Sequence, residues 1–356
     1  MSAVAAQVVW LVITGNAWLA GRSVSQSWRT AAVFKSIAEV IFADPPAPGG
    51  RRPDYASDPI SFFEHLRADG VIGLRLDNRR RCTERDRSPW LAARNLEAFV
   101  SGGRRWLVEA IDRDGAATSW EPHWWYIARD RDPRGDWSVR YYRHHPKHAA
   151  IATHVRSAAS LARGLHDSLT RAQRFAENHG IGELFGPTFA DAAQRLERPI
   201  TNPDGLVADV LAHVPENMAR VLWAEQKAWV FGGMGSWNDL VFSGATLREY
   251  QLISEAVYRA CCRALEDCAN STFPDASIRW PWSPRTRRSG CQLAGSKMAR
   301  ATFNPVSTGP SRAETVLRRI YTSRTFTVVV RSIKIGAYVL LAIWVLLIGC
   351  VIYVTI

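Results

Sequence analysis

Cysteine is scarce in this chain, and six cysteines are too few to indicate a disulfide scaffold in a chain of this length. No Cys-x-x-Cys pair occurs, and a chain of 356 residues does not need disulfides to stabilise its core. Cys261 and Cys268 are seven residues apart and share a helix face, so we expect both to be small buried residues. This cysteine usage fits a reducing compartment.

Acidic residues are almost absent between residues 276 and 334, where Glu314 stands against twelve Lys and Arg residues. The whole chain carries a formal charge of +12, so this segment holds nearly all of the excess and the rest is close to neutral. Ser, Thr, Pro and Gly are frequent here, which predicts a flexible basic arm over residues 274–334. Such an arm attracts anionic lipid head groups, and nucleic acid is a less favoured partner.

Charge is absent from residues 335–356, which are continuously apolar. A helix of this length rises about 33 Å, enough to cross the hydrocarbon core of a bilayer. We therefore predict a single-pass membrane protein with a C-terminal transmembrane helix. Cationic residues are retained on the cytoplasmic side, so the bulk of the chain should be cytoplasmic. The membrane-proximal basic residues are Arg318, Arg319, Arg324, Arg331 and Lys334.

Residues 3–20 also lack charge, yet no Lys or Arg precedes them as in a secretory signal. Polar residues within the stretch weaken the case for a second span. A buried or amphipathic helix is favoured, with a span and a signal peptide as alternatives. We assign residues 1–46 to an N-terminal helical segment, and the Pro- and Gly-rich residues 44–54 to a linker.

Residues 55–148 read as an α+β region. Ser57-Asp58-Pro59 predicts the start of a short helix, and 106–111, 123–128 and 137–142 are rich in aromatic and branched residues. Turn residues at 112–115 and 132–136 separate these runs, which predicts an antiparallel meander beside a strand at 71–76. Alternate side chains point to opposite faces of a sheet. The meander should therefore present a binding face built from Trp106, Trp124, Trp125, Tyr126, Trp137, Tyr141 and Tyr142, unless helices cover both faces.

Residues 149–273 have helical periodicity and form a predicted helical module. Apolar residues line one face from Ile151 to Ala176, with breaks expected at Gly164 and at 178–180. Further helices are expected over 187–196, 216–231 and 247–269. The predicted fold class is thus α+β: a small antiparallel meander, a helical module and a C-terminal transmembrane helix.

A glycine-rich loop follows the helix that ends near Val230. Gly232, Gly233 and Gly235 give the backbone freedom to present N–H groups to an anion, with Ser236 and Asn238 as donors and Asp239 as an acid or base. His123, before the aromatic run Trp124-Trp125-Tyr126, is a fourth catalytic candidate. The loop is not a P-loop, because Gly-Lys-Ser/Thr is missing. The alternative is a tight turn in which Asn238 or Asp239 caps the next helix.

The string Phe-Gly-Gly-Met-Gly-Ser-Trp-Asn-Asp from Phe231 to Asp239, with Glu249-Tyr250 beyond it, resembles a family of uncharacterised bacterial proteins. Its members share a Phe-Gly-Gly-Met-Gly-Ser-aromatic-Asn-Asp core before a closing helix. The likeness spans about residues 165–271. It implies a shared α-helical module and no known activity. Members of that family are mostly soluble, so the basic arm and the span depart from the pattern.

His144, His145 and His148 surround Pro146 without a Cys or carboxylate cluster, which indicates loop histidines rather than a metal site. No cofactor motif is present. The sequence therefore favours a tail-anchored, non-catalytic binding module with a protein partner. A membrane-associated enzyme using the glycine-rich loop, and a nucleic-acid binder using the basic arm, are the alternatives.

Overall fold

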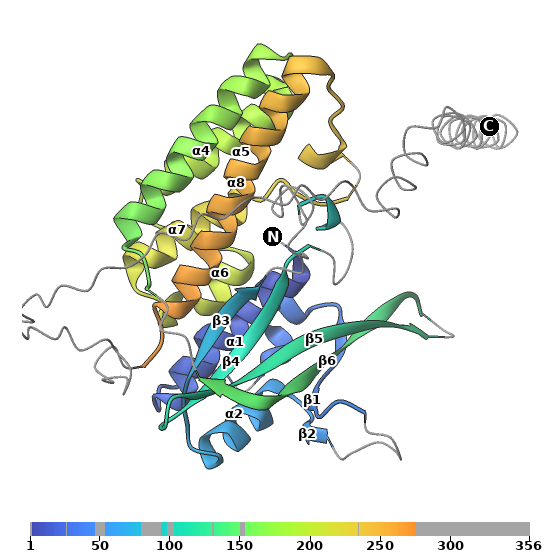
Figure 1. Ribbon diagram of the computed structural model, residues 1–356, viewed down its shortest axis with the longest axis vertical. Helices are drawn as coiled ribbons and strands as arrows, with labels where there is room; N and C mark the ends of the chain where they lie inside the picture. Colours follow the sequence, from blue (N-terminus) through green and yellow to red (C-terminus); the bar gives the residue numbers. More distant parts are fainter. Residues whose placement is uncertain are drawn as a thin grey trace, which may run out of the picture. The chain divides into compact units, whose positions relative to one another are not determined.

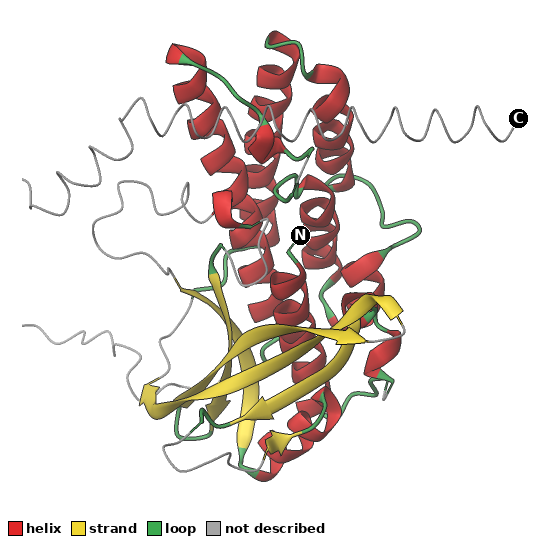
Figure 2. Ribbon diagram, turned by 90° about the vertical axis from the view of Figure 1, so that its right-hand side faces the viewer, coloured by secondary structure: helices red, strands yellow, loops and turns green. Residues whose placement is uncertain are grey.

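The computed structural model describes residues 2–25, 27–46, 54–79, 94–97, 103–129, 132–149, 154–233 and 235–274. These belong to one compact unit, Met1–Thr286, with a mixed α+β fold in which a six-stranded sheet adjoins a group of helices (Figures 1 and 2). The predicted span at 335–356 and the basic arm beyond Pro274 lie outside the described residues. Among the helices of the described part, none has the length and apolar character needed to cross a membrane.

The sheet has the strand order β2-β1-β6-β5-β4-β3. Neighbouring strands are antiparallel except β1 and β6, which are parallel. The predicted meander is present as β4, β5 and β6, with β3 beside β4. Strand β1 departs from the helical segment expected over residues 1–46, because pairing with β6 buries its apolar side chains. The strands are β1 (Ile37–Ala43), β2 (Asp54–Ala56), β3 (Val71–Arg79), β4 (Arg105–Asp112), β5 (Ala116–Arg129) and β6 (Asp132–Ala149).

Strands β5 and β6 are longer than the sequence predicts. Strand β5 begins at Ala116, before the predicted run at 123–128, so His123 lies inside the strand instead of at its start; residues 132–136 belong to β6 instead of a turn. Cross-strand pairs such as Ile127↔Asp136 continue the ladder through those turn-forming residues. The histidines at 144–148 are likewise in β6, so their assignment to a loop is wrong. The ladder shifts register between Ala117 and Ser119, opposite the stretch that contains Pro146.

The described part has seven α-helices, most of which extend away from the sheet (Figure 2). Asp58 caps the second of them with Pro59 in the first turn, as predicted. The long helix at 158–178 runs through Gly164 without the expected break, because one glycine costs a helix only about 1 kcal/mol and packing offsets it. The helices are α1 (Ala3–Leu19), α2 (Pro59–Ala68), α4 (Ala158–Asn178), α5 (Gly182–Arg195), α6 (Gly205–Val210), α7 (Glu216–Ala228) and α8 (Gly244–Asn270).

Helix α1 lies in the core, as the favoured interpretation of residues 3–20 predicts. Its residues from Val8 to Ile13 are almost completely buried, and it packs against β3, β4 and α8. Gly15 makes the closest approach: a Cβ atom at this position would lie 2.4 Å from Leu74 and 2.7 Å from Phe63. The helix therefore joins the sheet to the helical module, and its apolar character is explained by burial on all sides.

Two buried asparagines satisfy the backbone of β3 on the side away from β4. Asn16 of α1 accepts from the N–H of Leu74 at 2.6 Å and donates to its carbonyl at 2.9 Å. Asn270 of α8 does the same with Leu76, at 2.7 and 3.0 Å. Each side-chain amide thus replaces one residue of a neighbouring strand, because an amide has the same donor and acceptor as a peptide group. We call this pair the asparagine clamp.

Candidate functional site

The β5–β6 pair forms a hairpin that extends beyond the other strands (Figure 1). Strand β4 pairs with β5 only from Val108↔Trp120 to Ile111↔Ala117. Pro122 follows, and because proline has no N–H the ladder is easily ended there. Beyond Trp120, the edge of β5 that faces β4 is paired with no described strand, whereas its other edge stays paired with β6. We call residues 120–127 of β5, with residues 137–144 of β6, the aromatic hairpin.

The inner face of the aromatic hairpin passes from buried to exposed along its length. Trp120 and Tyr141 are fully buried in the core. Farther out, Trp124 and Trp137 are half-buried, with ring centroids 6.0 Å apart. Tyr126 lies 5.4 Å from the Trp137 ring and is 52% exposed. The rings on this face therefore change from buried near Trp120 to exposed at Tyr126.

The outer face of the hairpin carries a second group of rings. His123 lies 5.1 Å from Tyr142 and 6.2 Å from Trp125, and the Trp125 and Tyr142 rings meet edge to face at 6.2 Å. Trp125 is 43% exposed. Exposed aromatic rings on both faces of one hairpin are typical of protein-binding surfaces, where tryptophan and tyrosine are enriched.

A charged group adjoins these outer rings. Glu121 is buried, forms an ion pair with Arg105 and a 3.0 Å contact with His144 Nε2. Burial alone would raise the pKa of Glu121, but the hydrogen bonds and charge of Arg105, together with the nearby histidines, lower it overall. Glu121 is therefore an anion that fixes the base of the hairpin, and its charge is already neutralised by its neighbours.

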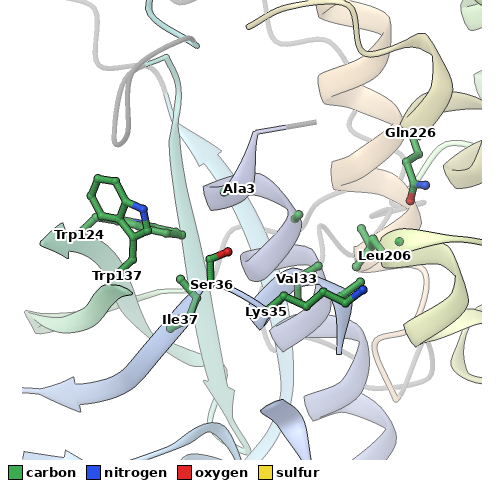
Figure 3. Close-up of a pocket in the computed structure, with 12 residues that line it drawn as sticks. Ala3, Val33, Lys35, Ser36, Ile37, Trp124, Trp137, Leu206 and Gln226 are labelled. Carbon is green, nitrogen blue, oxygen red and sulfur yellow. The ribbon is translucent and has the colours of Figure 1, made fainter. Parts of the chain in front are cut away.

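A pocket of about 500 Å³ opens beside the inner face of the hairpin (Figure 3). Trp124 and Trp137 form one side, Gln226 of α7 lies on the other, and Lys35 and Ser36 lie between them. The Nε1 atom of Trp124 is buried and has no hydrogen-bond partner among the described residues. The remaining walls are apolar or backbone surfaces, from Ala3, Ala6, Ala32, Val33, Ile37, Gly205 and Leu206. The pocket suits an apolar group.

The glycine-rich loop is held by bonds within itself. The Ser236 N–H donates to the Gly233 carbonyl and to the Asp239 carboxylate, each at 3.2 Å, and the Ser236 hydroxyl donates to the Gly232 carbonyl at 3.1 Å. Ser236 and Asp239 form a capping box around the short helix Trp237–Asp239. Gly235 has φ +81°, a conformation that favours glycine.

Asn238 fastens this loop to the segment at 94–97, whose Arg94 also bonds to α8. Its amide nitrogen donates to the Arg94 carbonyl at 3.1 Å, and Arg94 donates back to Asn238 at 3.0 Å and to the Tyr250 hydroxyl at 3.1 Å. The Trp237 indole, buried beneath, donates to Ser254 at 2.7 Å. The Ser236 hydroxyl and the Asn238 amide, which were proposed to bind an anion, are thus engaged in holding the loop.

The four catalytic candidates fall into two groups. Ser236, Asn238 and Asp239 are brought together in the capped turn. His123 is in β5, and its described ring contacts are those with Trp125 and Tyr142 on the sheet. The structure supplies no described contact between His123 and the loop. The basic residues predicted next to the membrane, from Arg318 to Lys334, lie outside the described residues.

Sequence reasoning identified the aromatic rings but missed the pocket. Lys35, Ser36 and Gln226 come from segments far apart in the chain, and none is part of a recognisable motif. Only the juxtaposition of β1, β6 and α7 brings them together. Comparisons with protein-family models, curated proteins and solved structures found no match for this chain, so its function has to be inferred from this geometry.

Proposed function

We propose that this chain is a non-catalytic binding module, held at a membrane by residues 335–356, whose aromatic hairpin takes up an extended segment of a protein partner. One observation carries the proposal: the hairpin presents exposed rings, Trp125 and Tyr126, on opposite faces of the part of β5 past Trp120, which has no described partner on its β4 side. Monomeric proteins seldom leave such rings together on an extended strand.

Strand addition is the binding mode that fits this surface. A peptide alongside residues 123–127 would pair its backbone with β5, and its alternate side chains would lie on the two faces of the hairpin. On the inner face one apolar side chain would reach the pocket beside Trp124 and Trp137. Ring contacts of this kind dominate binding energies, whereas rim contacts add little.

The enzymatic alternative has less support in the geometry. The polar groups of Ser236, Asn238 and Asp239 are used to cap and anchor a turn. A nucleophile or base needs a partner that orients it toward a substrate, and the described partners of these residues are backbone groups and Arg94. Nucleic-acid binding through the basic arm remains an alternative that concerns residues outside the described part.

Photo-crosslinking from the hairpin tests the binding proposal. A benzophenone amino acid in place of Tyr126 should capture one discrete partner in cells, because this ring is 52% exposed at the proposed interface. The same group in place of Leu252, which is 65% exposed on α8, provides the control and should capture none. Equal capture from both sites would contradict the proposal.

A Trp125→Ala/Tyr126→Ala variant should lose the captured partner when the crosslinker is moved to Tyr142. Because both deleted rings are exposed, the free energy of unfolding should change by no more than about 0.5–1 kcal/mol. A Leu252→Ala variant, which removes an exposed side chain of the helical module, should retain the partner. Loss of folding, measured by circular dichroism, would distinguish a damaged hairpin from a lost interface.

The membrane attachment has its own test. With residues 335–356 present, the chain should stay in the membrane fraction after carbonate and high salt, and leave it only with detergent, because about 20 apolar residues insert stably. Deleting residues 335–356 while keeping the basic arm should make the protein extractable by salt. If the full chain is extracted by carbonate alone, the anchor does not exist.

A further inference from the structure

A polar groove runs between α4 and α8, on elements that the aromatic hairpin does not use. It has a volume of about 360 Å³. It exists because small residues line both helices at successive turns: Ser160, Gly164 and Ser168 on α4, and Ala256 and Ala260 on α8. Residues four apart share a helix face, so their short side chains leave a furrow where two helices would otherwise interlock.

Three arginines border this groove. Arg156 lies just before α4, and Arg259 and Arg263 lie one turn apart on α8. Partial burial lowers the pKa of Arg263, and the charges of Arg156 and Arg259 lower it further, so the Arg263 guanidinium is repelled by the other two. Like charges gathered at one place cost free energy, and an anion between them would remove that cost.

The acidic neighbours do not neutralise all three. Arg156 pairs with Asp267 at 2.8 Å, and Arg259 pairs with Glu255 one turn earlier in α8. Arg263 forms no hydrogen bond and no ion pair within 4 Å with any described residue. The charges of Asp267 and Glu266 act at longer range and raise its pKa slightly against the larger lowering effects. The groove thus keeps one guanidinium whose donors are available.

From this we infer an anion site: the groove between α4 and α8 binds a phosphate group, held by the guanidinium groups of Arg156, Arg259 and Arg263. Arginine suits this ligand because its planar N–H groups match two phosphate oxygens at once. Ser160 adds a hydroxyl at the edge of the groove. The group could belong to a soluble phosphorylated molecule or to a lipid phosphomonoester, since both present the same oxygens.

Gly164 provides the sharpest test. A Cβ at this helical position would meet nothing within 4 Å, so a side chain can enter the groove without disturbing the core. Gly164→Glu places a carboxylate among the arginines, whereas Gly164→Ala is the matched control, because it fills the same position without a charge and favours the helix. Arg263→Gln removes the guanidinium that has no described hydrogen bond, and Arg171→Gln, on the exposed surface of α4, is its control.

Calorimetric titration of the full chain with inorganic pyrophosphate should show binding that Gly164→Glu abolishes and Arg263→Gln weakens about tenfold, the usual effect of losing one charge-assisted hydrogen bond. Gly164→Ala and Arg171→Gln should bind normally. A second experiment compares binding to vesicles that contain phosphatidic acid with binding to phosphatidylserine vesicles. Because the basic arm of the protein also attracts lipid, only the binding that Gly164→Glu removes is attributed to the groove. Binding in either experiment supports the site and shows whether a soluble phosphate or a lipid phosphate occupies it. Binding in neither, or binding that Gly164→Glu and Arg263→Gln leave unchanged, would overturn it.

Discussion

Replacing Glu225 with methionine is expected to stabilise the protein by about 3 kcal/mol at neutral pH. Glu225 lies in α7 and is completely buried, and neither carboxylate oxygen has a hydrogen-bond partner among the described residues. It faces the buried thiols Cys261 and Cys268 of α8. A carboxyl in such surroundings loses its hydration without compensation, whereas methionine has a similar length and packs well beside sulfur and apolar atoms.

The effect depends on pH, with a definite sign. Burial raises the pKa of Glu225 from 4.5 to about 8. Between these values the folded chain holds a proton that the unfolded chain releases, so Glu225 lowers stability progressively as pH rises from about 4.5 to about 8. The penalty is absent below this window and constant above it. Glu225→Met should therefore gain little at about pH 4.5 and most above pH 8.

Urea unfolding of the full chain across this pH range measures the effect. Burial also raises the pKa of Glu97 and of Glu266 to about 7, so both make the free energy of unfolding fall with pH in the same direction. Both are present in variant and wild type, so the difference between the two proteins isolates Glu225. Glu197→Met, at an exposed position, is the control and should change stability by less than about 0.5 kcal/mol. If Glu225→Met were less stable than wild type at every pH, the carboxyl would have to hold a partner in solution.

Removing one half of the asparagine clamp should have the opposite effect. Asn16→Leu keeps the size of the side chain but leaves the N–H and carbonyl of Leu74 buried without partners, and it also loses the 3.0 Å bond to Thr272. Each orphaned group costs about 1–3 kcal/mol, so a loss of about 3–5 kcal/mol is expected. Asn270→Leu should cost slightly less, because it loses the two bonds to Leu76 alone.

Hydrogen exchange locates this effect. The clamp holds the backbone amides of Leu74 and Leu76, so both variants should lower the protection of these amides against exchange. Amides in β6, on the far side of β5, should lose less protection. Asn178→Leu, exposed at the end of α4, tests whether the substitution itself matters and should leave stability within about 0.5 kcal/mol. Unchanged protection in β3 would show that its edge is held by packing and not by the two amides.

The mixed α+β class, the meander and the main helices could be predicted because periodicity reports which face of an element is buried. Strand ends were less predictable. Asp132-Pro133-Arg134-Gly135-Asp136 has the composition of a turn, yet it continues β6, since pairing with β5 outweighs local preference. The parallel strand β1 was hidden for a similar reason: its partner lies about 100 residues away in the sequence, and no local signal marks it.

Some of the candidate sites could be predicted from the sequence and others could not. Trp125 and Tyr126 stand out in the sequence, because a run of rings on alternating faces cannot be entirely buried by one layer. The pocket, the arginine groove and Glu225 could not be found from sequence, since each depends on which helix faces which. The glycine-rich loop is conspicuous in the sequence, but its serine and aspartate serve to cap a turn.

The asparagine clamp also constrains how this protein is made. Asn270 is 194 residues beyond Leu76, so a growing chain exposes one border of β3 until α8 has been synthesised. Any product that stops before α8 would carry an open strand border able to pair with another unfinished copy. The border of β3 is therefore covered only once α8 has been synthesised, and products that stop earlier should be prone to self-association even when every strand is present.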